Sequence, residues 1–205
     1  MMSLMRKKAM TKINDLIIAS NNQNKIREIK EILGDFFTNI YSLSDKNINV
    51  EIEETGLTFE ENAIIKAKYI AELTGITALS DDSGLEVNAL DGKPGVYSAR
   101  YAGEKANTEN NNAKLLKELE GITDRRANFT SVIAICYPNG KIITARGTTY
   151  GRILEKLEGN NGFGYDPLFF SNDLQKSFGI ATSEEKNKVS HRGLALQKMK
   201  ELLSK

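Results

Sequence analysis

Two adjacent aspartates offer the most direct chemistry in this chain of 205 residues. The segment Ser80-Asp-Asp-Ser-Gly84 follows a short apolar run, so Asp81 and Asp82 stand together at the end of a predicted strand. Carboxylates this close raise each other's pKa, and a bound cation is the usual remedy. Magnesium prefers one or two carboxylates together with substrate phosphates. An ordinary Asp-rich turn explains the same residues nearly as well, so this segment alone leaves both interpretations open.

A second acidic pair, Glu53 and Glu54, lies just before a predicted helix. Carboxylates near a helix N-terminus are favoured by the helix dipole, and most such pairs have no further role. These two would join a metal site only if the fold brings them close to Asp82.

The segment Ser20-Asn-Asn-Gln-Asn-Lys25 is a candidate phosphate site. A strand ends there and a helix begins, so backbone N–H groups at the helix N-terminus and the Lys25 ammonium could both face an anion. The segment is not a P-loop, because the G-x-x-x-x-G-K-[ST] spacing is absent. Taken alone, the segment is better explained as an Asn-rich turn that caps a helix.

A glycine-rich segment, Gly162-Phe-Gly-Tyr-Asp-Pro167, could hold a base. Glycines on both sides of Phe163 leave the backbone free to present its ring in an open cleft, where it could stack on a purine. The alternative is that Phe163 and Tyr165 pack into the core. Asp166 could cap a turn or contact a ligand.

The only histidine, His191, lies beside Arg192 near a predicted helix start. A zinc site is disfavoured because no second histidine is available, and a Ser-His-Asp triad is disfavoured because no G-x-S-x-G segment occurs. Arginine pairs well with the O6 and N7 atoms of a purine. A solvated surface pair is the alternative.

Alternating strands and helices must position these residues. The predicted strands are residues 15–20, 77–80, 85–87, 126–137 and 141–150, the last two forming a hairpin about Pro138-Asn-Gly140. The predicted helices are residues 25–33, 59–74, 110–120 and 190–203, with capping boxes at Thr58/Glu61 and Thr182/Glu185. This pattern predicts an α/β protein with some α+β character, in which helices flank a mixed sheet. No shift in composition marks a linker, so we expect a single domain over residues 1–205.

The overall composition limits the function. Hydrophobic residues make up 40% and charged residues 27% of the chain, and the formal net charge is +1, so no global field favours nucleic acid or an anionic membrane. One cysteine, Cys136, excludes an internal disulfide. No apolar stretch reaches the length of a membrane helix, and residues 1–12 lack the apolar core of a signal peptide. We therefore expect a cytoplasmic protein with a frayed extension at residues 1–12.

The order of the motifs resembles one family. In succession the chain carries S-N-N-x-x-K, E-E-T-G-L-T-F-x-E-N-A, D-D-S-G-L, P-G-V-Y-S-A-R-Y-A-G, F-G-Y-D-P and S-H-R-G-x-A-L. This series, which runs from about Leu16 to the C-terminus, closely resembles the Ham1/RdgB family of inosine and xanthosine triphosphate pyrophosphatases.

The resemblance implies an elongated, bent mixed sheet, two lobes with a central cleft, a homodimer and Mg²⁺ as cofactor. It implies hydrolysis of ITP, dITP or XTP to the monophosphate and pyrophosphate. Asp82 would be the proton-accepting residue, and Glu53 and Asp82 would serve the metal. The substrate-binding residues would be Ser20, Asn21, Asn22, Gln23, Asn24, Lys25, Lys66, Ser83, Phe163, Gly164, Tyr165, Asp166, Lys186, His191 and Arg192.

One departure from the family pattern is visible, and two other functions remain open. After Lys176 the family commonly shows T-x-A-E-L, whereas this chain has Ile180 in place of the glutamate. The alternatives are a Maf-type pyrophosphatase for other modified nucleotides and a nucleotide sensor without activity. The relative preference for ITP, dITP and XTP, and the way guanine is rejected, do not follow from the sequence.

Overall fold

A single seven-stranded mixed sheet forms the centre of the computed structural model, which describes residues 13–105 and 107–205. The strands follow the order β2-β1-β3-β4-β5-β6-β7; β1 pairs in parallel with β2 and β3, and all later pairs are antiparallel. The strands are β1 (Ile13–Ile18), β2 (Phe37–Ser42), β3 (Thr77–Val87), β4 (Arg126–Cys136), β5 (Ile142–Ile153), β6 (Phe169–Ser171) and β7 (Lys176–Ser177). The mixed α/β architecture predicted from the sequence is confirmed. The extension expected at residues 1–12 lies outside the described residues.

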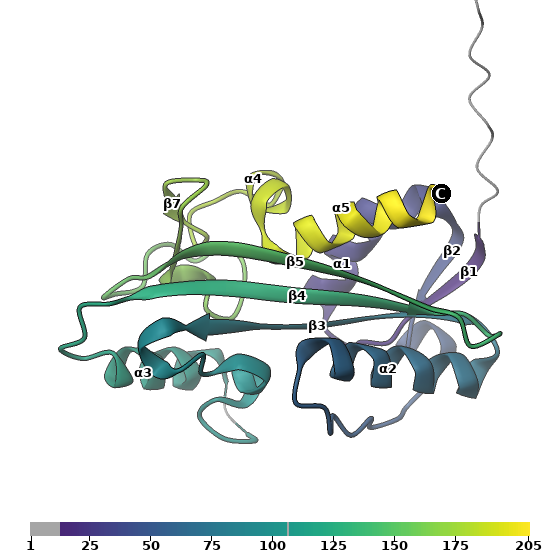
Figure 1. Ribbon diagram of the computed structural model, residues 1–205, viewed down its shortest axis with the longest axis horizontal. Coiled ribbons are helices and arrows are strands. Elements are labelled where there is room, and N and C mark those ends of the chain that lie inside the picture. The colour runs from purple at the N-terminus through teal and green to yellow at the C-terminus, as the bar shows by residue number, and fades with distance from the viewer. Residues whose placement is uncertain (1–12, 106) are drawn as a thin grey trace, which may run out of the picture.

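Helices cover both faces of this elongated sheet (Figure 1). They are α1 (Gln23–Leu33), α2 (Phe59–Thr74), α3 (Thr108–Glu118), α4 (Ser183–Val189) and α5 (His191–Leu203). In Figure 1, α2 and α3 lie below opposite ends of the long strands, and α1, α4 and α5 lie above them. The helices therefore form one layer on each face of the sheet.

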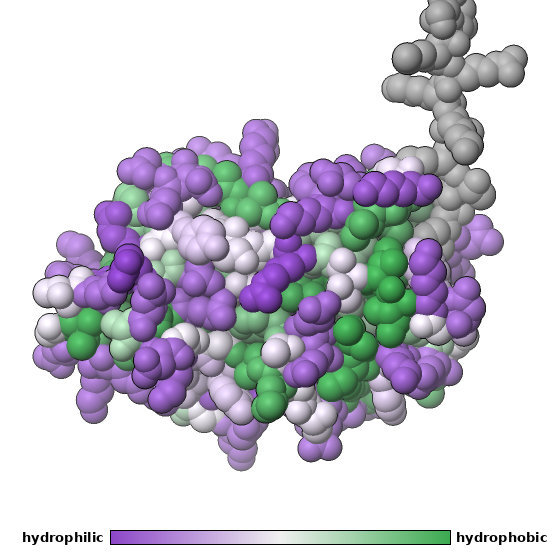
Figure 2. Space-filling model, viewed as in Figure 1, coloured by the Kyte–Doolittle hydropathy of each residue, from purple (hydrophilic) through white to green (hydrophobic). Residues whose placement is uncertain are grey.

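Three apolar clusters hold the layers together. One joins α1 and α5 to β1, β3, β4 and β5 around residues such as Ile29, Leu79 and Leu196. A second joins α2 to the opposite face of the same strands, with Ala67 and Ile70 packed on the sheet. The third lies at the far end and contains most of the buried aromatic rings. On the face seen in Figure 2, polar side chains cover most of the surface and hydrophobic ones gather over α2 and the neighbouring sheet.

The predicted break in β3 is wrong. Residues 77–80 and 85–87 are not separate strands about an acidic turn; β3 runs without interruption from Thr77 to Val87. Asp81 and Asp82 pair in register with Ile133 and Val132 of β4 in the middle of the sheet. A strand tolerates this because each carboxylate meets a cation on its own face, as described below.

The other predicted boundaries shift by a few residues. The helix expected at 110–120 begins at Thr108, capped by the side chain of Asn107. The Thr182/Glu185 capping box is present, but it begins the separate short helix α4, and α5 then starts at His191 with Ser190 as its cap. This second cap fixes His191 and Arg192 in the first turn of α5, where their side chains reach the sheet.

Candidate active site

Asp81 and Asp82 point to opposite faces of β3 because successive side chains of a strand alternate. Asp81 lies on the face covered by α1 and α5, and Asp82 lies on the face covered by α2. Both side chains are almost completely buried. The strand therefore supplies one carboxylate to each of two neighbouring polar clusters.

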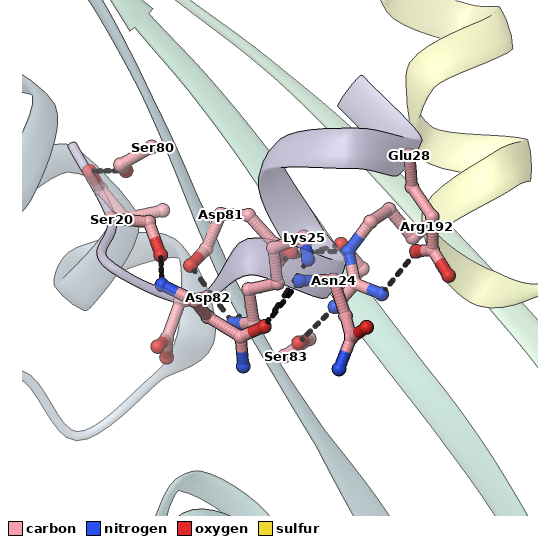
Figure 3. A network of polar contacts seen from close by, with 12 residues as sticks. Ser20, Asn24, Lys25, Glu28, Ser80, Asp81, Asp82, Ser83 and Arg192 are labelled. Carbon is pink, nitrogen blue, oxygen red and sulfur yellow. Dashed lines mark hydrogen bonds and ion pairs between the residues drawn. The ribbon is translucent and has the colours of Figure 1, made fainter. Parts of the chain in front are cut away.

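Asp81 belongs to a buried network of charges (Figure 3). Nε of Arg192 donates to Oδ2 of Asp81, and Ser131 donates to Oδ1 over 3.0 Å. The Lys25 ammonium lies 3.6 Å from Oδ2. Burial alone would raise the pKa of Asp81, but Arg192 and Lys25 outweigh it and hold that pKa well below the usual range. Asp81 is thus a permanent anion that fixes two cations in place.

Glu28 completes this network and was not among the residues predicted from the sequence. The side chain of Glu28, on α1, is buried, and its Oε2 accepts a 2.7 Å hydrogen bond from Nη1 of Arg192. Its Oε1 lies 3.5 Å from Nζ of Lys186. A glutamate on the apolar face of α1, between Ile26 and Ile29 in sequence, was the available signal, because a carboxylate buried there needs a cationic partner.

Lys66 links Asp82 to Glu54 on the other face of the sheet. Nζ of Lys66 donates to Oδ1 of Asp82 over 2.8 Å and to Oε1 of Glu54 over 2.7 Å. Burial raises the pKa of Asp82 in spite of the neighbouring Lys66. For Lys66, burial lowers the pKa, but Asp82 and Glu54 outweigh it, so the net pKa is raised and the ammonium stays charged.

One oxygen of this cluster is unsatisfied. Oδ2 of Asp82 is buried and has no hydrogen-bond partner among the described residues. An orphaned carboxylate oxygen is costly, and a bound cation or a water would satisfy it. The described residues contain no cluster of three metal-ligating side chains. Two carboxylates next to a phosphate-sized space nevertheless suit magnesium, which takes the remainder of its ligands from phosphates and water.

Glu53 and Glu54 differ in position. Glu53, the predicted metal ligand, is exposed, whereas Glu54 is half-buried and lines the cavity beside Asp82. Exposed and half-buried residues alternate along the segment before α2, and of the two glutamates only Glu54 lines the cavity. Both glutamates were visible in the sequence, but the side that each faces was not.

The predicted phosphate segment forms the start of α1. The side chain of Asn22 caps the helix by accepting from the N–H groups of Asn24 and Lys25, and Oγ of Ser20 accepts from the N–H of Asn22. Ser20, Asn21, Asn22 and Lys25 line a cavity of about 300 Å³ that also contains Lys66 and Asp82. We call this cavity the phosphate pocket. Gln23 lines neither this cavity nor the one described next; its side chain donates to the Asn21 carbonyl.

A second cavity of about 470 Å³ adjoins the first, and we call it the base pocket. Phe163 lines it, with Nζ of Lys186 4.8 Å from the centre of the ring. Lys186 donates to Oδ2 of Asp166 over 2.8 Å, and the same oxygen accepts from the N–H of Phe163. These contacts fix the aromatic loop against α4. The remaining predicted residues on its wall are Asn24, Ser83, Gly164, Tyr165, His191 and Arg192.

His191 and Arg192 occupy the floor of the base pocket. The imidazole stacks on Phe129 with ring centres 4.7 Å apart, and its Nδ1 has no hydrogen-bond partner in the described part of the chain. Burial, together with Arg192 and Lys186, lowers the pKa of His191 well below its usual value, so the ring is neutral. Arg192 also donates from Nη2 to Oγ of Ser83 over 3.0 Å, so much of its hydrogen-bonding capacity is used inside the protein.

Tyr165 differs from Phe163 in that it is anchored in the protein. It is buried, and its hydroxyl donates to the carbonyl of Ser98 over 2.9 Å. Its ring packs in the third apolar cluster. Only Phe163 of the two aromatics is thus free to stack on a ligand, as its position between two glycines with positive φ allows.

The two pockets share Asn22, Lys25, Ser83 and Ala99. A ligand with an aromatic base at one end and a run of phosphates at the other fits across this junction. Several further residues line the walls without having been predicted to do so: Phe129, Ser98, Asn107, Thr108, Asn111, Ala99 and Arg100.

Comparison with known proteins decides the family. The model of the Ham1 family matches residues 16–202. The chain belongs to the Ham1 family. A dITP/XTP pyrophosphatase of Clostridium perfringens (strain 13 / Type A) is 52% identical over 195 residues, covering 91% of this chain and 96% of that protein. A dITP/XTP pyrophosphatase of Geobacter sulfurreducens is 51% identical over 190 residues, covering 92% and 96%.

Solved structures of Ham1 proteins have the same fold. The Ham1 protein of Staphylococcus aureus superposes with a TM-score of 0.84 at 44% identity, covering 92% of this chain and 97% of that one. A HAM1 protein from Coxiella burnetii gives a TM-score of 0.85 at 40% identity, covering 93% and 98%. Among the described residues of this Ham1-family chain, no helix is long and apolar enough to cross a membrane.

Proposed function

We propose that this protein hydrolyses abnormal purine nucleoside triphosphates (ITP, dITP and XTP) to the nucleoside monophosphate and pyrophosphate. The observation that carries the proposal is the junction of the two pockets, where a base site with a free aromatic ring meets a cationic site containing Asp82. Relatives about half identical to this chain are named dITP/XTP pyrophosphatases, which supports the same reaction.

The phosphate pocket supplies the charges that such a reaction needs. A triphosphate repels an attacking nucleophile until its negative charge is neutralised. Lys25 and Lys66 face the pocket as fixed cations, and their side chains are mostly buried, so their charges are poorly screened. Lys25, Asn22 and Ser83 lie at the junction, where they would hold the phosphate next to the ribose, and Lys66 lines the phosphate pocket alone.

Asp82 is the proposed general base. The pKa of Asp82 is raised and so lies closer to neutral pH than that of an ordinary aspartate, which improves proton transfer from a water molecule. The unpartnered Oδ2 is free to accept that proton, while Oδ1 remains bound to Lys66. The water would attack the phosphorus next to the ribose, and pyrophosphate would leave toward Lys66.

Asp82 and Glu54 would hold Mg²⁺ in this proposal, and Glu53, the ligand predicted from the sequence, is the alternative partner of Asp82. The bound ion would supply neutralisation of the phosphate oxygens. Glu54 is favoured over Glu53 because it already shares the Lys66 ammonium with Asp82.

Base selection follows from hydrogen-bond donors on the floor of the base pocket. The six-position of inosine and xanthosine is an acceptor, whereas that of adenosine is a donor. Arg192 carries donors only, and some remain free after it binds Asp81, Glu28 and Ser83. Adenine would leave these donors facing another donor, and such buried mismatches discriminate strongly.

We also propose a cytoplasmic homodimer. The free thiol of Cys136 fits a reducing compartment, and exposed apolar side chains such as Leu57, Leu73 and Tyr97 offer surface to a second copy. Sedimentation of the purified protein measures the oligomeric state directly.

The decisive assay measures pyrophosphate release from ITP, dITP, XTP, GTP and ATP, with Mg²⁺ and with the metal removed by a chelator. We expect release from ITP, dITP and XTP but not from ATP, and only with metal. Equal release from ATP would refute the proposed selectivity. Tight binding without release would indicate a nucleotide sensor, and release from modified pyrimidine nucleotides alone would indicate a Maf-type enzyme. Thermal melting with and without the chelator checks that metal removal leaves the protein folded.

A further inference from the structure

Arg100 is a cation of the phosphate pocket that neither the motif reading nor the proposed mechanism uses. It is the last residue of η4 (Gly95–Arg100), a 3-10 segment that follows β3 and packs against it. Its side chain lines the phosphate pocket but not the base pocket. If the phosphate next to the ribose binds at the junction, as proposed above, Arg100 lies on the side of the later phosphates.

The backbone on both sides of Arg100 is firmly held. Oγ of Ser98 accepts from the N–H of Leu85 in β3, and the Ser98 carbonyl accepts from Tyr165. On the following side, Asn111 of α3 donates to the carbonyl of Ala99 and accepts from the N–H of Ala102. The backbone that carries Arg100 beside the pocket is therefore held by both β3 and α3.

The guanidinium of Arg100 has charge partners but no close ones among the described residues. Nη1 lies 3.7 Å from Oε2 of Glu54, and Nε lies 3.6 Å from Oε1 of Glu104. Both distances exceed a hydrogen bond, and Glu104 is a surface side chain with 87% of its area exposed. Only 28% of the Arg100 side chain is exposed. A positive group is thus held beside the pocket with its hydrogen-bonding capacity largely unused.

The chemistry of this group matches a phosphate. A guanidinium presents parallel N–H donors that bind two oxygens of one phosphate, and arginine is favoured wherever such paired recognition matters. A ribose or a base edge at this position is disfavoured, because the aromatic side chains Phe129, Phe163 and Tyr165 line the base pocket and not the phosphate pocket. We propose that Arg100 binds the β- and γ-phosphates and retains the pyrophosphate leaving group; this inference rests on the proposed function and extends it.

The test measures binding of the two products separately. Pyrophosphate and inosine monophosphate are each titrated into the full-length protein by calorimetry in the presence of Mg²⁺, using wild type, Arg100→Gln and Arg100→Lys. The matched control is Arg126→Gln, which removes the same charge from an exposed arginine paired with Asp124 outside both pockets. Thermal melting confirms that each variant is folded.

We expect Arg100→Gln to weaken pyrophosphate binding at least about tenfold, the usual effect of losing a charged hydrogen bond, and to change inosine monophosphate binding less than about twofold. Arg100→Lys keeps the charge but loses the paired donors, so an intermediate loss is expected, and this variant carries the test if Arg100→Gln does not fold. Arg126→Gln should bind both products as wild type does.

Three results would overturn the inference: unchanged pyrophosphate affinity in the folded Arg100 variants, an equal loss of affinity for both products, or a wild-type protein that binds no pyrophosphate. Failure of the proposed function is recognised separately, as an absence of pyrophosphate release from dITP and XTP by the wild type.

Discussion

Asp81 and Asp82 are consecutive residues of one strand, yet the two faces of the sheet treat them in opposite ways. On the α5 face, Asp81 has every oxygen bound, and its pKa is held down by Arg192 and Lys25 against the effect of burial. On the α2 face, Asp82 keeps one oxygen unpartnered, and burial raises its pKa. A satisfied buried carboxylate fixes structure, whereas an unsatisfied one is available for a ligand or a proton. Asp81 therefore has a structural role on one face of β3, and Asp82 has a chemical role on the other face.

The largest expected effect on stability comes from Asp81→Asn. The substitution removes one of the two carboxylates paired with the completely buried guanidinium of Arg192, and breaking a buried pair in this way typically costs about 3–5 kcal/mol. We expect the free energy of unfolding, measured by urea denaturation, to fall by about that amount. Asp173→Asn, at an exposed position, is the matched control and should change it by less than about 0.5 kcal/mol. Equal stability of the two variants would contradict a structural role for Asp81.

The variants Glu54→Gln and Glu53→Gln test which glutamate acts together with Asp82. Glu54 shares Lys66 with Asp82, whereas Glu53 faces solvent. We expect Glu54→Gln to lower kcat/KM for dITP about a hundredfold and Glu53→Gln to lower it less than about threefold. Measuring activity across a Mg²⁺ titration also locates the metal, because only the true ligand should shift the half-saturating concentration. The reverse ranking would assign the metal to Glu53.

A smaller effect concerns His191 and the pH dependence of stability. Its pKa in the folded protein is lowered, while in the unfolded chain it is about 6.5. Below that pH the unfolded state binds a proton that the folded state does not, so this contribution destabilises the protein as pH falls. Relative to pH 7.5, the loss at pH 5.5 is about 1.4 kcal/mol.

His191→Gln removes this contribution, so the stability difference between wild type and variant should change by about that amount between the two pH values. Because His191 is the only histidine, its imidazole NMR signals report its pKa directly. A pKa above 6.5 in the folded protein would contradict the buried, neutral ring.

Local signals in the sequence were sufficient for much of the fold and for the identity of most pocket residues. The Thr58/Glu61 capping box marks the start of α2, and Pro138-Asn-Gly140 marks the β4–β5 turn. The continuity of β3 could not be predicted, because two charges in a strand look unfavourable until Arg192 and Lys66, both distant in sequence, neutralise them.

Orientation and partner choice were the other limits. Glu53 and Glu54 are indistinguishable by type, and only the path of the chain before α2 decides which one faces the cavity. The sequence predicts Arg192 as a donor to the base, whereas in the structure Arg192 also donates to Asp81 and Glu28. Such roles depend on contacts between α1, β3 and α5, which no local pattern encodes.

The most direct test of the division between Asp81 and Asp82 is the turnover of Asp82→Asn on dITP in saturating Mg²⁺. This change keeps the size of the side chain and removes a carboxylate that burial already disfavours. We expect kcat to fall at least about a hundredfold, the usual contribution of a general base, while the variant stays folded and still binds inosine monophosphate. Turnover near that of the wild type would contradict the account and would remove Asp82 from the chemistry.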